Sequence, residues 1–74
     1  MRRIDDNTFE IRTYDNGVLH FVIGRTYKGI GTCGEAKDLE VIGTLEYSPR
    51  VKELLLVTKR GLPCSINERT LSYL

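Results

Sequence analysis

The feature that most constrains the fold of this chain is the apolar block Leu54-Leu55-Leu56-Val57, within the stretch 41–66. Turn-forming residues flank the block on both sides: Ser48-Pro49-Arg50 precede it and Lys59-Arg60-Gly61 follow it. A short apolar run between two turn signals is typical of a β-strand. The block therefore predicts the central strand of an antiparallel meander, with the rest of the chain packed around it.

The length of the chain limits the core that it can build. A chain of 74 residues forms one domain, and a domain of this size buries only about 60% of the surface that its unfolded form exposes. Residues 1–7 are polar and lack periodicity, which predicts a flexible N-terminal arm. We expect residues 8–74 to form a single small β-domain whose stability is marginal or shared with a partner.

The charges of the chain nearly balance, with 11 basic and 10 acidic residues. Proteins that bind polyanions in general rely on an excess of Lys and Arg, so the composition argues against that class and leaves room only for a local basic patch. The apolar runs are far shorter than the roughly 20 residues needed to cross a bilayer. Residues 1–6 contain no apolar signal segment, so we expect a cytoplasmic protein.

The cysteines and the single histidine predict no metal or other cofactor. Cys33 and Cys64 are the only cysteines, and without a signal peptide they are expected to be reduced thiols that act as small hydrophobic side chains. A zinc site would need further ligands at close spacing, and His20 has none beside it in the sequence. His20 is a pH-sensitive group by type, but no second catalytic residue accompanies it.

Two alternating runs, 8–14 and 18–23, flank the turn signal Asp15-Asn16-Gly17 and predict the first hairpin. A three-residue loop 15–17 with Gly17 in the left-handed conformation gathers the apolar side chains on one face, whereas a two-residue loop would set Arg12 opposite Phe21. The outer face then contains Val18 and Val22, which a partner could cover, although valines suit strands anywhere. The expected pairs are Phe9 with Ile23, Ile11 with Phe21, and Thr13 with Leu19.

Gly29, Gly31 and Gly34 match the G-x-G-x-x-G fingerprint of dinucleotide-binding loops. That motif requires a full helix after it, and residues 35–39 leave room for only one or two helical turns. We therefore favour a structural role for these glycines, in a bent strand at the corner of a small barrel, with Tyr27 and Ile30 supplying its core contacts.

Residues 40–47 predict the first strand of a second hairpin, closed by a loop at 48–50. This register leaves Glu53 on the apolar face opposite Leu45. Because Leu54 and Leu56 then face away from Leu55 and Val57, the strand requires burial on both sides, from a closing segment or a second subunit. The expected pairs are Glu46 with Lys52, Tyr47 with Val51, Gly43 with Leu55, and Val41 with Val57.

A third hairpin with the loop 59–61 is expected to pair Leu56 with Cys64 and Leu54 with Ile66. Pro63 cannot donate a backbone hydrogen bond, which predicts an edge or irregular position. A turn at 67–70 followed by a short strand at 71–74 resembles the last third of SH3-like and Tudor-like barrels. The resemblance is confined to this segment, contains no specific motif, and implies a fold without any binding residues.

Together these patterns predict an all-β fold: a small antiparallel meander or SH3-like barrel of five to six short strands, with at most one short helix near 34–39. An open antiparallel sheet with that helix is the alternative. The expected core comprises Phe9, Ile11, Leu19, Phe21, Ile23, Val41, Leu45, Leu54, Leu55, Leu56, Val57, Cys64, Ile66 and Leu71.

We expect no enzyme, because the sequence contains no catalytic triad pattern, metal cluster or paired carboxylates tied to a pocket. The first functional hypothesis is a small regulatory or inhibitor-type interaction protein, of viral or accessory-gene origin, that acts through a β-face or edge as a homo-oligomer. The alternative is a small β-barrel that binds single-stranded nucleic acid through aromatic and basic side chains. The candidate binding residues, for nucleic acid or a protein partner, are Arg12, Tyr14, His20, Arg25, Tyr27, Lys28, Lys59 and Arg60.

Overall fold

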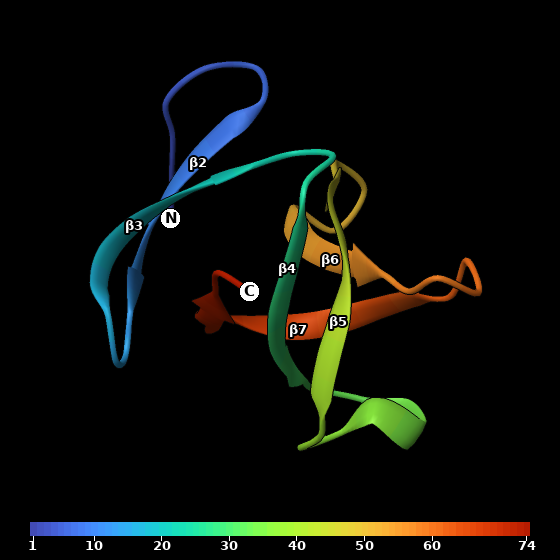
Figure 1. Ribbon diagram of the computed structural model, residues 1–74. Helices are drawn as coiled ribbons and strands as arrows, with labels where there is room; N and C mark the ends of the chain where they lie inside the picture. Colours follow the sequence, from blue (N-terminus) through green and yellow to red (C-terminus); the bar gives the residue numbers. More distant parts are fainter.

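The computed structural model describes residues 1–74 and confirms the all-β prediction. There is one strand more than expected, because two residues near the N-terminus also pair. No helix is long and apolar enough to cross a membrane. The strands are β1 (Arg2–Arg3), β2 (Thr8–Thr13), β3 (Gly17–Val22), β4 (Thr26–Gly31), β5 (Glu40–Ser48), β6 (Glu53–Val57) and β7 (Pro63–Ser72), with a 3₁₀ turn, η1 (Gly34–Ala36), between β4 and β5 (Figure 1).

The strands form two antiparallel sheets. One is three-stranded in the order β1-β2-β3, and the other closes into a barrel, β4-β5-β6-β7, because β7 pairs back onto β4. Figure 1 shows the β2–β3 hairpin standing beside the barrel. The two parts meet at β7, where the Tyr14 amide donates a 2.9 Å hydrogen bond to the Arg69 carbonyl. Closure leaves the barrel without an exposed edge.

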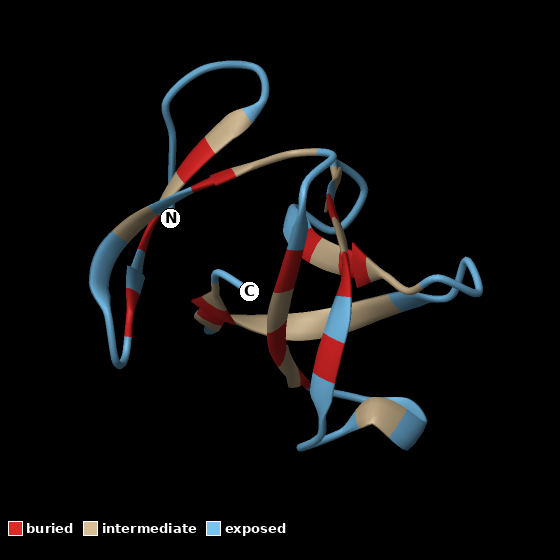
Figure 2. Cartoon of the chain, in the orientation of Figure 1, coloured by how far each residue is buried: buried red, intermediate tan, exposed pale blue.

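Buried positions alternate with more exposed ones along β2, β4 and β5, as the pleat of a strand requires (Figure 2). Most of the expected core is confirmed, and Tyr27 has the core position expected of it, whereas Ile30 is only half-buried. Other residues expected in the core are only half-buried: Leu19, Ile23, Leu55, Val57, Cys64 and Ile66. The buried hydrophobic residues are Phe9, Ile11, Phe21, Tyr27, Val41, Leu45, Leu54, Leu56 and Leu71.

The pairs predicted for the first hairpin were wrong by two residues, although the faces were right. Thr13 pairs with Gly17, so the loop consists of residues 14–16. The Thr13 hydroxyl closes this turn, because it donates to the Gly17 carbonyl at 2.8 Å and accepts from the Asn16 amide at 3.1 Å. An even shift preserves the alternation, which explains why the same side chains face inward. The observed pairs include Phe9 with Phe21 and Ile11 with Leu19.

Gly17 adopts the left-handed conformation that the turn signal predicted, with φ of +68°. A Cβ at this position would touch nothing within 4 Å, so a substitution there is strained only through the backbone. We expect Gly17→Val to lower the free energy of unfolding by about 1 kcal/mol or more. Urea denaturation measures this loss. Gly17→Asn is the control, because asparagine tolerates this conformation better than valine, and an equal loss in both variants would contradict the explanation.

The register predicted for the second hairpin was wrong by an odd number of residues. Ser48 pairs with Glu53, which leaves the four-residue loop 49–52 with Lys52 in the left-handed region at φ of 56°. An odd shift reverses the faces of one strand relative to the other. Leu54 and Leu56 therefore face inward while Leu55 and Val57 are half-buried on the outside. The observed pairs are Leu45 with Leu56, Tyr47 with Leu54 and Glu46 with Leu55, in place of Glu46 with Lys52, Tyr47 with Val51, Gly43 with Leu55 and Val41 with Val57.

The third hairpin has the predicted register, since Leu56 pairs with Cys64. Pro63 is the first residue of β7, a position where a missing amide hydrogen is tolerated. The turn expected at 67–70 is instead a bulge within one continuous strand, because Ile30 pairs with Asn67 while Lys28 pairs with Ser72. The Thr70 hydroxyl holds the bulge by donating to the Asn67 carbonyl at 2.6 Å and accepting from the Ile30 amide at 2.8 Å.

Residues 1–7, expected as a flexible arm, turn back across β2. Arg2 and Arg3 form β1 opposite Glu10 and Phe9. The Arg3 guanidinium lies over the rings of Phe9 and Tyr47, at 5.3 and 5.2 Å from their centroids. Stacking of this kind, together with the backbone pairing, ties the N-terminal segment to the core.

Candidate binding groove at Tyr73

The structure brings together half of the residues proposed from the sequence. His20, Arg25, Tyr27 and Lys28 line two neighbouring depressions that share Tyr73. Arg12 and Tyr14 lie outside these depressions, on the outer face of β2 and in the loop that follows it. Lys59 and Arg60 are exposed in the β6–β7 turn, which Figure 1 shows on the far side of the barrel from the β2–β3 hairpin. The eight residues therefore do not form one surface.

Tyr27 was expected to supply core contacts and was also named as a candidate binding residue, and the structure gives it the core position. Only 6% of the residue is exposed, because Tyr27 alternates inward with Gly29 and Gly31 along β4. Its ring meets the edge of Phe21 with 5.0 Å between centroids. Its hydroxyl accepts a 2.9 Å hydrogen bond from the Val22 amide. Tyr27 therefore supports the floor of the depression and offers no face on which a ligand could stack.

We define the Tyr73 groove as these two depressions, which measure about 480 and 400 Å³. One wall comes from the β2–β3 loop and β3, and the other from the segment 25–28 at the start of β4. The C-terminal residues cross between the two walls. The lining residues are Asn16, Leu19, Lys28, Ser72 and Tyr73 on one side, and His20, Val22, Arg25, Thr26, Tyr27, Tyr73 and Leu74 on the other.

Tyr73 is held in the groove by three contacts and is still half-exposed. Its hydroxyl donates a 2.7 Å hydrogen bond to the His20 carbonyl, and its ring lies 5.4 Å from that of Phe21 and 5.9 Å from that of Tyr27. Sequence reasoning placed Tyr73 only in a closing strand. Tyr73 follows the inward-facing Leu71 by two residues, so alternation along the strand indicated that both side chains share a face. That pattern could not identify its partner, because His20 in β3 lies 53 positions away in the sequence.

The charged side chains that line the groove are all basic: Arg25, Lys28 and the protonatable His20. Glu10, on the neighbouring strand β2, lies 3.2 Å from His20 Nε2 and 3.3 Å from the Arg2 guanidinium. The hydrogen bond from His20, assisted by the charge of Arg2, holds the pKa of Glu10 below its ordinary value. Glu10 is thus already partnered, and the groove presents a basic lining to a ligand.

The edge of β3 adjoins the groove. The sheet order gives β3 only one strand neighbour, so backbone groups of alternate residues point away from β2. Three of these groups have partners: the His20 carbonyl bonds the Tyr73 hydroxyl, the Val22 amide bonds the Tyr27 hydroxyl, and the Val22 carbonyl accepts from the Arg25 amide at 3.2 Å. By the same alternation, the backbone groups of Val18 and the amide of His20 remain for a partner strand.

No group of three or more His, Cys, Asp and Glu side chains lies close enough to hold a metal ion. Every buried side-chain nitrogen and oxygen has a hydrogen-bond partner. Comparisons with protein-family models, curated proteins and solved structures find no match to this chain. The chemistry of its own surface therefore has to indicate its function.

Proposed function

We propose that this domain binds an extended, acidic protein segment, which adds as a strand to the edge of β3 and lies along the Tyr73 groove. The observation that carries the proposal is a strand edge on which the backbone groups of Val18 and the amide of His20 remain free, beside a groove whose charged side chains are all basic. In strand addition, main-chain hydrogen bonds supply affinity, and the pockets beside the edge select alternate side chains. The function is that of an interaction module without catalysis.

The groove suggests which side chains the segment carries. Arg25 and Lys28 lie on the wall opposite β3, where they would attract carboxylates on every second residue of an added strand. Leu19 and the half-exposed ring of Tyr73 offer apolar contact between these charges. An alternating acidic and apolar sequence fits this arrangement.

Self-association is a second use of the same edge. Two copies of β3 could pair antiparallel about a two-fold axis, so the homo-oligomer expected from the sequence remains a proposal. The sequence argument for an oligomer was that the strand containing Leu55 and Val57 needs burial on both sides. That argument is weaker now, because both residues are already half-buried within one chain. Sedimentation equilibrium distinguishes the two: a monomer at every concentration would restrict the edge to other protein segments.

Binding of single-stranded nucleic acid is the second candidate function. The half-exposed Tyr73 ring between Lys28 and Arg25 favours it, since a base stacked on an aromatic side chain contributes about 1–3 kcal/mol. Tyr27 is buried and Tyr14 lies outside the groove, which leaves one stacking platform where successive bases need several. The strand edge therefore favours a protein segment.

A labelled peptide of alternating valine and glutamate should bind, and its valine–lysine counterpart should not. We expect the double substitution Arg25→Ala with Lys28→Ala to weaken binding about 10-fold, because two exposed ion pairs are lost. Fluorescence anisotropy measures the affinity. NMR should show shifted and exchange-protected amides at Val18 and His20, because these groups would pair with the added strand.

The double substitution Lys59→Ala with Arg60→Ala is the matched control. It removes the same charge from the β6–β7 turn, outside the Tyr73 groove, and should leave the affinity unchanged. Equal losses of affinity in both double variants would mean that net charge alone controls binding, and would contradict binding at the Tyr73 groove. Tighter binding of a labelled oligothymidine than of the acidic peptide would favour the nucleic-acid function instead.

A further inference from the structure

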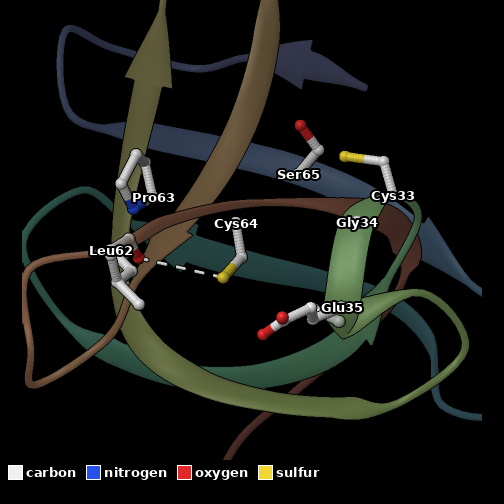
Figure 3. A pocket seen from close by; sticks show the side chains of 8 residues that line it. Cys33, Gly34, Glu35, Leu62, Pro63, Cys64 and Ser65 are labelled. Atoms are coloured by element: carbon white, nitrogen blue, oxygen red, sulfur yellow. Dashed lines mark hydrogen bonds between the residues drawn. The ribbon is translucent and has the colours of Figure 1, made fainter.

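Both cysteines line a second groove, separate from the Tyr73 groove. This cysteine groove measures about 500 Å³ and lies between η1 and the start of β7 (Figure 3). Cys33 is exposed and Cys64 is half-buried, and both are free thiols. The lining residues are Cys33, Gly34, Glu35, Ala36, Leu62, Pro63, Cys64 and Ser65.

Backbone contacts just beyond the last pair of the β4–β7 ladder bring the two cysteines near one another. Gly31 of β4 pairs with Ile66 of β7, and the next residue, Thr32, donates from its amide to the Ser65 carbonyl at 3.0 Å. Cys33 follows Thr32 with an extended backbone, φ of −152° and ψ of 166°, and Cys64 precedes Ser65, so an antiparallel continuation of this pairing would make the two cysteines neighbours. Facing residues of antiparallel strands have Cα atoms about 4.5–5.5 Å apart. That spacing falls within the range of about 4.4–6.8 Å that disulfides span.

The side chains need to rotate before their sulfurs can meet. Cys64 Sγ donates to the Leu62 carbonyl at 3.8 Å, and Figure 3 shows it turned toward Leu62 and away from Cys33. A thiol is a weak hydrogen-bond donor, so this contact opposes rotation very little. Cys33 is exposed and free to change its rotamer.

We propose that Cys33 and Cys64 form a reversible disulfide by exchange with a small-molecule disulfide such as oxidised glutathione. The Cys33 thiolate attacks one sulfur of glutathione disulfide, whose S–S bond breaks and releases one glutathione. Cys64 then attacks the Cys33 sulfur and releases the second glutathione. The protons of the two cysteines pass to the two departing thiolates, so the cysteines are oxidised and the glutathione disulfide is reduced. The product joins the end of β4 to the start of β7 beside the barrel.

The experiment equilibrates the full chain with reduced and oxidised glutathione, quenches it by alkylation, and weighs the products by mass spectrometry. We expect a monomer that has lost two hydrogen atoms and carries no alkyl group. Because the fold holds the thiols together, the equilibrium constant for closing the disulfide should be roughly 30-fold or more higher in the native chain than in urea. Cys64→Ser should stop at a glutathione adduct on Cys33, and Cys33→Ser should react more slowly because Cys64 is half-buried.

Several outcomes would overturn the proposal. They are two alkylated cysteines in the oxidising buffer, a chain that carries two glutathione adducts, a disulfide between two chains, or an equilibrium constant no higher in the native chain than in urea. The comparison of native with denatured protein uses the unmodified chain, so it does not depend on whether a serine variant folds.

Discussion

Replacing Gly31 by alanine is expected to lower the free energy of unfolding by about 3 kcal/mol, at the upper end of the range for overpacked sites. An added Cβ would overlap the backbone carbonyl of Ala36 and lie 2.8 Å from its carbon. The Gly31 amide donates to the Leu39 carbonyl, and the Gly31 carbonyl accepts from the Asp38 amide, both at 2.9 Å. Because β7 pairs with Gly31 on the other side, the backbone cannot move away from the clash.

Gly29→Ala is the matched control, two residues earlier in the same strand. A Cβ there would meet the Leu71 side chain at 3.3 Å and the Leu56 side chain at 3.7 Å, and these flexible ends can adjust. We expect a loss of about 1 kcal/mol. Urea denaturation followed by circular dichroism measures both variants, and equal losses would contradict the steric explanation. This crowding explains why position 31 is glycine without invoking a bound nucleotide. Where the dinucleotide-binding motif requires a full helix, the chain forms only the three-residue turn η1.

Leu56→Ala is expected to cost about 3 kcal/mol, within the range for leucine truncation in a closed core. Leu56 is fully buried and pairs with the equally buried Leu45, so its removal leaves a cavity between β5 and β6. Leu55→Ala removes the same atoms from the opposite face of the same strand. Leu55 is only half-buried, and we expect a loss of about 1 kcal/mol.

The difference between these two losses tests which face of β6 lies inward. Chemical denaturation of both variants under the same conditions gives it directly. A loss at Leu55 as large as that at Leu56 would mean that both faces of β6 are covered. That result would support the second subunit inferred from the sequence, and concentration-dependent stability would accompany it.

Local patterns accounted for the fold class, the inward and outward faces of the first hairpin, and the loop and register of the third. The alternation of residues 8–14 and 18–23 assigned the right faces to β2 and β3, because side-chain parity depends only on neighbours along the strand. The loop 59–61 set the correct pairing of Leu56 with Cys64, because a short turn with Gly61 at φ of 80° allows little choice. These features depend on contacts between residues close in sequence.

Contacts between distant residues decided the rest. The second hairpin has a longer loop, and packing of Leu54 and Leu56 against Leu45 selected its register over the charge pattern that favoured pairing Glu46 with Lys52. Barrel closure buried Tyr27, and the return of β7 placed Tyr73 against β3 and Ser65 against Thr32, which brings the two cysteines into one groove. Alternation along a strand determines which side chains share a face, but only the packing of the two sheets against each other determines which strands line the same groove. For that reason the sequence could name His20, Arg25 and Lys28 as candidate binding residues without showing that they gather around Tyr73.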